Sequence, residues 1–286
     1  MCKTSPNSTA PVTPELPPYP AVKRVLVCLP LSERAVNLAR QAMMLASRLG
    51  ADLIFAHVGQ EVRARRRQLE ELFERNELRY DPESLIVERG SAPRVLLEIM
   101  EREEADLVIA GALRWESSLG KYNRSIAGRV VRYSKCPTWL ISRSLNAEGS
   151  LSTAVLSSES AKDSCRFLKW YLPWARRLGL QSLHVVKSGR SDAHLQKSDA
   201  TVAWACGVKL RFVLQAKRSW CDALWYAEAL PADVLCVPLS AAQIRAWDRL
   251  LRHGIDPELE HLPKSVLIVP QGFGPETSLL RRMQAA

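Results

Sequence analysis

The feature that most constrains this chain of 286 residues is an internal repeat. Three segments of the first half return in the second half in the same order. RLGADLIFAHV, ADLVIAG and CPTWLIS, which begin at Arg48, Ala105 and Cys136, are matched by RLGLQSLHVV, ADVLCVP and LPKSVLIVP, which begin at Arg177, Ala232 and Leu262. The offsets are all close to about 127 residues. Solenoid repeats are only about 20–50 residues long, so this spacing indicates two copies of a small domain.

The first copy alternates apolar runs with amphipathic stretches. Val25–Leu29 and Asp52–Val58 are typical of buried strands. Between them, apolar residues recur at helical spacing, with Ser32 as the expected N-cap and Gly50 as the stop. Further strands are expected at Leu85–Glu88, Asp106–Ala110 and Thr138–Ile141, and further helices near Arg63–Arg79, Ala92–Arg102 and Ile126–Tyr133. This alternation predicts an α/β fold with a parallel, doubly wound sheet in each copy.

The repeat also predicts how the chain divides. We expect the first domain over residues 21–143, a polar linker over 144–150 and a more divergent second domain over 151–271. Residues 1–20 are rich in Pro, Ser and Thr and lack the apolar core of a secretory signal, which predicts a disordered leader. Residues 272–286 are expected to form a C-terminal tail.

Composition narrows the class of protein. No uninterrupted apolar stretch approaches the roughly 20 residues that a membrane span needs, so we expect no membrane insertion. The 7 cysteines are scattered without a CxxC pair, and Cys28 and Cys236 lie in apolar runs. This pattern predicts reduced thiols in the core of a cytoplasmic protein.

The net charge of +10 raises the question of a nucleic-acid partner. The clearest basic cluster spans Arg63–Arg67 and is followed by glutamates at Glu70, Glu71 and Glu74. Opposite charges about four residues apart stabilise a solvated helix face. Since no basic motif interleaved with aromatic residues accompanies the cluster, we expect a solvated helix rather than nucleic-acid binding.

In the order of its segments, the chain resembles the universal stress protein family in tandem form. The resemblance rests on GADLIFAHV, EADLVIAG and CPTWLIS, which follow an apolar first strand and a long first helix. It implies a five-stranded parallel sheet flanked by helices in each domain. Family members pair through their last strands, so it also implies an internal pseudo-dimer through Thr138–Ser142 and Ser265–Val269, with a homodimer of the whole chain left open.

The resemblance places a nucleotide site in the loop GALRWESSLGKYNRS. Nucleotide-binding members carry G-x-x-G, nine residues and then G-[S/T] after the fourth strand, where glycines let backbone N–H groups approach phosphates. Here Gly111 and Ser125 keep the first and last positions, whereas Arg114 and Arg124 replace the other two glycines. The family's nucleoside-binding aspartate corresponds to Pro30.

Arginine at two glycine positions has two possible consequences. The long side chains fill space that the phosphates need, and this favours a blocked site and no cofactor. Alternatively, guanidinium groups bind phosphate strongly, so Gly111, Arg114, Arg124 and Ser125 could hold ATP or a smaller anion.

Other chemistry-bearing residues favour structural roles. His57 and His184 lie at matching strand ends without neighbouring ligands, which predicts buried histidines rather than metal ligands. No motif indicates a catalytic residue. Five tryptophans of the second half are expected to be mostly core or packing surface: Trp170, Trp174, Trp204, Trp220 and Trp225.

These observations and the resemblance predict a non-enzymatic, cytoplasmic stress-response module that binds or regulates a protein partner not identified by the sequence. Two alternatives stay open. One is an ATP-binding switch or weak ATPase that uses the modified loop. The other is a soluble regulatory partner of a membrane transporter.

Overall fold

The computed structural model describes residues 22–111, 126–141, 150–158, 161–188, 206–215, 220–239, 265–270 and 273. The first half contains strands β1 (Arg24–Cys28), β2 (Asp52–Val58), β3 (Leu85–Glu88), β4 (Leu107–Gly111) and β5 (Thr138–Ile141). Its helices are α1 (Arg34–Leu49), α2 (Val62–Arg75), α3 (Ala92–Arg102), α4 (Ile126–Tyr133) and the short 3-10 turn η1 (Pro82–Ser84).

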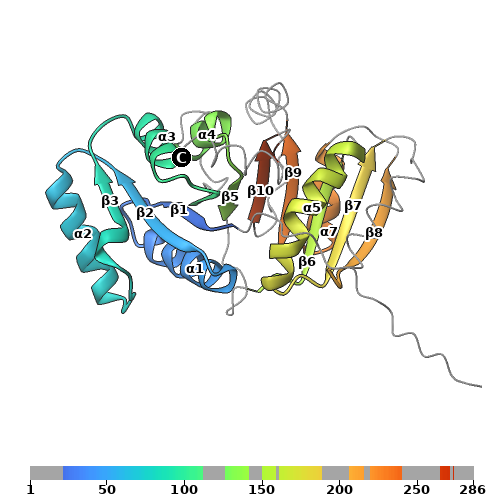
Figure 1. Cartoon of the computed structure of the whole chain (residues 1–286), viewed down its shortest axis with the longest axis horizontal. Coiled ribbons are helices and arrows are strands. Elements are labelled where there is room, and N and C mark those ends of the chain that lie inside the picture. The colour runs from blue at the N-terminus through green and yellow to red at the C-terminus, as the bar shows by residue number, and fades with distance from the viewer. Residues whose placement is uncertain are drawn as a thin grey trace, which may run out of the picture.

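The second half repeats this plan. Its strands are β6 (Thr153–Ser158), β7 (Ser182–Ser188), β8 (Lys209–Gln215), β9 (Val234–Leu239) and β10 (Ser265–Pro270), and its described helices are α5 (Ala161–Arg177) and α7 (Trp220–Ala229). All the strands join one sheet in the order β3-β2-β1-β4-β5-β10-β9-β6-β7-β8 (Figure 1). The described strands thus form two five-stranded parallel half-sheets, which confirms the predicted fold class.

Each half-sheet is doubly wound. The chain runs outward from β1 to β3 and then returns to β4 and β5 on the other side of β1. Crossovers between parallel strands are right-handed, so this reversal places α1 and α2 on one face and α3 and α4 on the other. The second half-sheet has the same reversal between β8 and β9, with α5 before it in the chain and α7 within the crossover that leads to β9.

In the first half β2, β3, β5, α3 and α4 have the predicted bounds, β1 and β4 are each shifted by one residue, and two further details are wrong. Helix α2 ends at Arg75 rather than near Arg79, because the chain turns there and the Asn76 amide donates to the Phe73 carbonyl at 3.2 Å. Ser32 is not the N-cap of α1, since that position is Glu33 and no side chain caps the helix. Gly50 ends α1 in the left-handed conformation (φ 65°), as predicted.

The two half-sheets join through their last strands. β10 pairs with β5 in antiparallel fashion, with Ser265 opposite Ile141 and Leu267 opposite Trp139. Every residue of β5 is buried. These are the two strands that the resemblance selected for pairing, although Ser142 lies outside the described residues.

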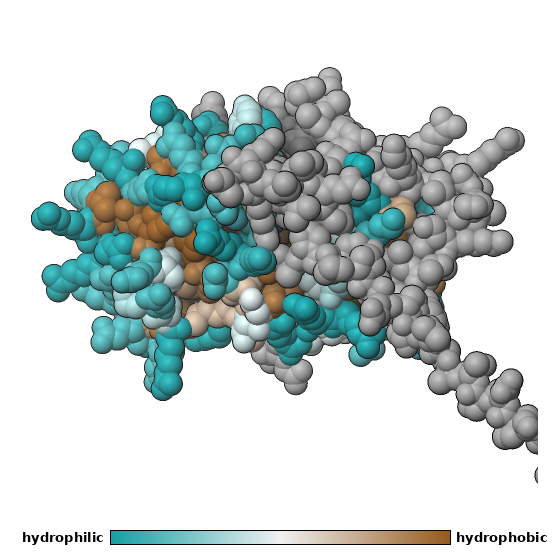
Figure 2. Space-filling view, viewed as in Figure 1, coloured by the Kyte–Doolittle hydropathy of each residue, from teal (hydrophilic) through white to brown (hydrophobic). Residues whose placement is uncertain are grey.

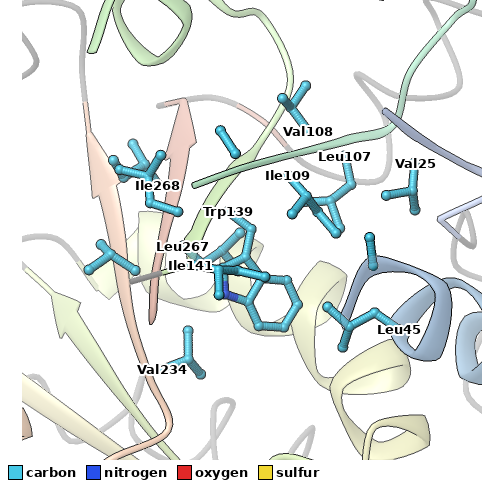
Figure 3. Packing of buried hydrophobic residues seen from close by; sticks show 14 of the residues in the cluster. Val25, Leu45, Leu107, Val108, Ile109, Trp139, Ile141, Val234, Leu267 and Ile268 are labelled. Atoms are coloured by element: carbon cyan, nitrogen blue, oxygen red, sulfur yellow. The ribbon is translucent and has the colours of Figure 1, made fainter. Parts of the chain in front are cut away.

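The join is also a continuous hydrophobic core. Trp139 of β5 is fully buried, and its ring centroid lies 6.0 Å from that of Trp174 on α5. Figure 3 shows Trp139 between apolar side chains of both halves, including Leu45 of α1 and Leu267 of β10. Two copies in the sequence therefore share a single core in the structure.

The repeated RLG segment lies where the two first helices meet. Each copy sits at the carboxyl end of its helix, α1 or α5. Arg177 of the second copy donates from Nη1 to the carbonyl of Leu49 in the first copy at 3.3 Å. An arginine in this position satisfies a carbonyl that the end of a helix leaves without an intrahelical donor.

The repeated Ala-Asp pair has a structural role as well. The carboxylate of Asp106 accepts hydrogen bonds from the amides of Lys23 (2.8 Å) and Arg24 (3.1 Å) at the start of β1. Asp233 accepts from the amides of Ser152 (2.7 Å) and Thr153 (3.1 Å) at the start of β6. The same aspartate thus fixes the amino end of the first strand in each half-sheet.

Candidate functional site

The predicted site lies at the carboxyl edge of the first half-sheet. The strand order reverses between β1 and β4, and ligands of doubly wound proteins bind at this switch point, beyond the carboxyl ends of the strands. Cys28 pairs with Ala110, so Pro30 and Gly111 both leave the sheet beside this point. Of the four predicted loop residues the structure describes only Gly111, because Arg114, Arg124 and Ser125 lie outside the described residues.

Gly111 is the last residue of β4 and pairs with Ile141 of β5. A Cβ atom built on it would meet only Cδ2 of Leu38, at 3.9 Å, which is ordinary van der Waals contact. Its φ also lies outside the left-handed region that favours glycine. No described neighbour therefore requires a glycine here.

The exit from β1 lacks the acidic group that a nucleoside would contact. Pro30 is exposed and offers neither a charge nor an amide donor. The first carboxylate after it is Glu33, whose Oε1 forms an ion pair with Nη2 of Arg75 at 2.8 Å. The described residues after β1 therefore supply no carboxylate at the position where the resemblance expects one, and we derive no chemistry through ATP.

His57 holds this edge together. Its Nδ1 lies 2.9 Å from the carbonyl oxygen of Leu29, and because a carbonyl can only accept, Nδ1 carries the proton. The bond ties the end of β2 to the chain leaving β1. Nε2 faces Gly59, where a Cβ atom would lie only 3.1 Å away. The predicted role as a buried structural histidine is confirmed.

His184, the matching residue of the second half, has a different partner. It is buried, and its Nδ1 lies 2.7 Å from the hydroxyl oxygen of Tyr226 on α7. Burial, followed by the positive charge of Arg211, lowers the pKa of His184 below its ordinary value. The ring is therefore neutral at neutral pH and serves as a link between the sheet and α7.

The carboxyl edge of the second half-sheet holds a polar cluster that sequence reasoning missed. Lys187 on β7 is buried, and its Nζ lies 4.5 Å from the ring centroid of Phe212. Its register neighbour Ser158 hydrogen-bonds through its hydroxyl to Ser164 on α5. A lysine within the apolar run SLHVVKS was the signal that could have found the cluster. The bond between the two serine hydroxyls links the end of β6 to the first turn of α5.

Two buried thiols are chemically quiet. Burial, with a smaller contribution from Cys136, raises the pKa of Cys28 to about 12. Burial likewise raises the pKa of Cys236. The described cysteines form no disulfide, which agrees with the predicted reduced core thiols.

The basic cluster on α2 forms the predicted solvated helix face. Arg67 pairs with Glu71 at 2.8 Å and Arg66 with Glu70 at 3.6 Å, each four residues apart. Figure 2 shows hydrophilic side chains projecting at the end of the molecule where Figure 1 places α2.

Two further searches cover only the described part of the chain. There, no three His, Cys, Asp or Glu side chains come close enough together to hold a metal ion. Within the same residues, none of the helices combines the length and hydropathy that crossing a lipid bilayer requires.

The strand order defines a doubly wound α/β protein with the same topology in each half. Residues 59–142 match the model of the universal stress protein family. This match bears out, over these residues, the resemblance found in the sequence. No curated protein sequence matches the chain.

Solved structures show that the tandem arrangement recurs. A universal stress protein from Archaeoglobus fulgidus superimposes with a TM-score of 0.66 at 14% identity, over 88% of this chain and 97% of that one. A putative universal stress protein from Pseudomonas aeruginosa gives a TM-score of 0.60 at 15% identity, over 93% and 98%. At these identities the likeness concerns the fold, and it extends over both halves.

Proposed function

We propose that the protein is a non-enzymatic binding or regulatory module of a cellular stress response, built as an internal pseudo-dimer of two universal stress protein-type domains. The observation that carries the proposal is the antiparallel pairing of β5 with β10. It occupies within one chain the strand edges through which family members pair, and so favours a self-contained unit over a homodimer joined at these edges.

The chemistry of the described residues supports a role without catalysis. The rings of His57 and His184 are each hydrogen-bonded to a structural partner. The thiols of Cys28 and Cys236 are buried and protonated. A cytoplasmic location is part of the proposal, because cytosolic reductants keep unpaired thiols in this state.

The ligand site of the first domain is altered in this proposal. Pro30 replaces the acidic contact, and Arg114 and Arg124 replace two loop glycines. Arginine in place of glycine adds bulk that hinders a triphosphate and adds positive charge that favours an acidic partner. A partner protein with an acidic segment is the kind of target that this arrangement favours.

Isothermal titration of the full chain with ATP and Mg²⁺ tests the altered site. We expect no saturable heat at micromolar concentrations. Micromolar binding would overturn this part of the proposal in favour of an ATP-binding switch, and ATP hydrolysis above background would favour a weak ATPase.

Two sets of variants show whether the arginines block ATP or bind it. If the arginines block the site, the double change Arg114→Gly and Arg124→Gly creates or strengthens ATP binding, whereas Arg63→Gly on the solvated face of α2 does not. If the arginines instead hold ATP, Arg124→Ala abolishes the binding seen with the unaltered chain.

A further inference from the structure

The amino edge of the second half-sheet is hollowed into a pocket of about 570 Å³. It lies where β7 and β8 begin, at the lower edge of the right-hand half in Figure 1. Three cationic side chains line it, Arg176 from α5 and Lys209 and Arg211 from β8, and none of the described lining residues carries a carboxylate. We propose that this pocket binds a small anion that carries two or more phosphate groups.

Arg176 is held in place by a feature of the backbone. Its Nη1 donates a hydrogen bond to the carbonyl of Cys206. The guanidinium passes over Gly207, whose φ of +65° favours glycine, and a Cβ atom there would collide with Nη1. The remaining guanidinium N–H groups can donate to a bound anion without first ordering the side chain, which lowers the entropic cost of binding.

Lys209 and Arg211 project from the same face of β8, because side chains two residues apart on a strand share a face. Both are exposed. Their register neighbours on β7 are Ser182 and His184. None of the ion pairs between described residues involves these two cations or Arg176. Like charges gathered in one hollow repel one another, and a bound polyanion relieves that repulsion.

The lining selects phosphate rather than an aromatic or apolar ligand. Guanidinium groups fit phosphate oxygens with two parallel hydrogen bonds. Ser182 and Gln181 add a hydroxyl and an amide. None of the described lining residues carries an aromatic ring on which a nucleobase could stack. Its volume exceeds that of a single phosphate and lies within the roughly 300–1,000 Å³ of small-molecule sites.

This pocket is separate from the altered nucleotide loop. The loop follows the carboxyl end of β4 in the first half, whereas the pocket lies at the amino ends of β7 and β8 in the second half. A polyanion bound in it is therefore independent of whether Arg114 and Arg124 block ATP. The pocket includes Arg176 at the end of α5, and the next residue, Arg177, bonds to the end of α1. A bound anion would therefore act on the contact between the two halves.

The test is titration of the full chain with pyrophosphate, and with tripolyphosphate, at low and at high salt. We expect saturable binding that weakens with salt. The double variant Lys209→Gln and Arg211→Gln should lose about tenfold or more in affinity, since it removes two charged donors. Lys169→Gln is the matched control, because Lys169 is an exposed cation of α5 outside the pocket lining. Absence of saturable binding by the unaltered chain overturns the proposal.

A second readout locates the bound anion. The charge of Arg211 contributes to the low pKa of His184. An anion beside Arg211 offsets that charge, so pyrophosphate should raise the pKa of His184 in an NMR titration, with His184→Gln identifying the signal. An unmoved pKa, together with binding lost in the Arg114→Ala and Arg124→Ala variant, would assign the anion to the loop of the first half and overturn the proposal.

Discussion

At the scale of single residues, one aspartate in each copy has a structural role that its place in the sequence does not reveal. Asp106 and Asp233 stand directly before β4 and β9, yet their carboxylates bind backbone amides at the start of β1 and β6. These contacts span 80 or more positions along the chain. The repeat identified the residues, but only the parallel arrangement of neighbouring strands explains why an acid is needed.

The two aspartates should differ in their contribution to stability. Asp233 is buried and also accepts from the Ser152 hydroxyl, whereas Asp106 is half-buried. We expect Asp233→Ala to lower the free energy of unfolding by about 3 kcal/mol and Asp106→Ala by about 1–2 kcal/mol. Urea denaturation measures both. Glu98→Ala on the exposed face of α3 is the control, and an Asp233 variant no less stable than this control would contradict the assignment.

His184 makes stability depend on pH. Its pKa in the folded protein is lower than the ordinary 6.5, so the unfolded chain binds more protons just below that pH. The contribution of this histidine is therefore complete above pH 6.5 and is lost as the pH falls from there toward the folded pKa. Unfolding free energies at pH 7.5 and 5.5 should differ less in His184→Gln than in the unaltered chain. An equal difference in both proteins would argue against this role.

At the scale of helices and strands, the sequence predicted those features that neighbouring residues along the chain determine. The strands β2, β3 and β5 and the helices α3 and α4 have the predicted bounds, because apolar periodicity and turn residues specify them locally. Lys187 and the pocket around Arg176 were not predicted. The lysine stands out within its apolar run, but its pairing with Ser158 depends on the strand register. The pocket depends on Gly207 lying beside Arg176, which is far away in the sequence, so no local pattern encodes it. Three residues of the predicted loop site lie outside the described residues, so that site stays a prediction.

Trp139 takes part both in the pairing of β5 with β10 and in the packing of α5 against the sheet. It lies opposite Leu267 of β10 and contacts the Trp174 ring of α5, so it belongs to both halves of the core. We expect Trp139→Ala to lower the free energy of unfolding by about 3–5 kcal/mol, through lost burial and the cavity that remains. Chemical denaturation followed by far-UV circular dichroism measures the change.

Trp225 on α7 offers a matched control. Its side chain is 43% exposed, so Trp225→Ala should change stability by no more than about 0.5 kcal/mol. Equal losses in the two variants would mean that Trp139 does not hold the halves together. The contrast also qualifies the expectation for the tryptophans: Trp170 and Trp174 are buried as predicted, whereas Trp225 is exposed.

At the scale of the whole molecule, a duplicated sequence has become a single cooperative structure. The β5–β10 ladder, the core around Trp139 and the bond from Arg177 to Leu49 all cross the boundary between the copies. Neither half can bury its last strand alone. An open strand edge can pair with another chain. In the tandem arrangement the edge strand of each copy pairs with that of the other and lies in the interior.

Separating the halves tests this dependence. Residues 1–143 and 144–286 expressed as two chains should each self-associate or aggregate, because β5 and β10 become exposed apolar edges. Mixed and refolded together, they should form a one-to-one complex, which light scattering after gel filtration detects. Adding Leu267→Asp to the second chain should prevent that complex, since it places a charge opposite Trp139 in the shared core. A stable, monomeric first half would show instead that the duplication preserved two independent domains, and that the paired strands add contact area without being needed for folding.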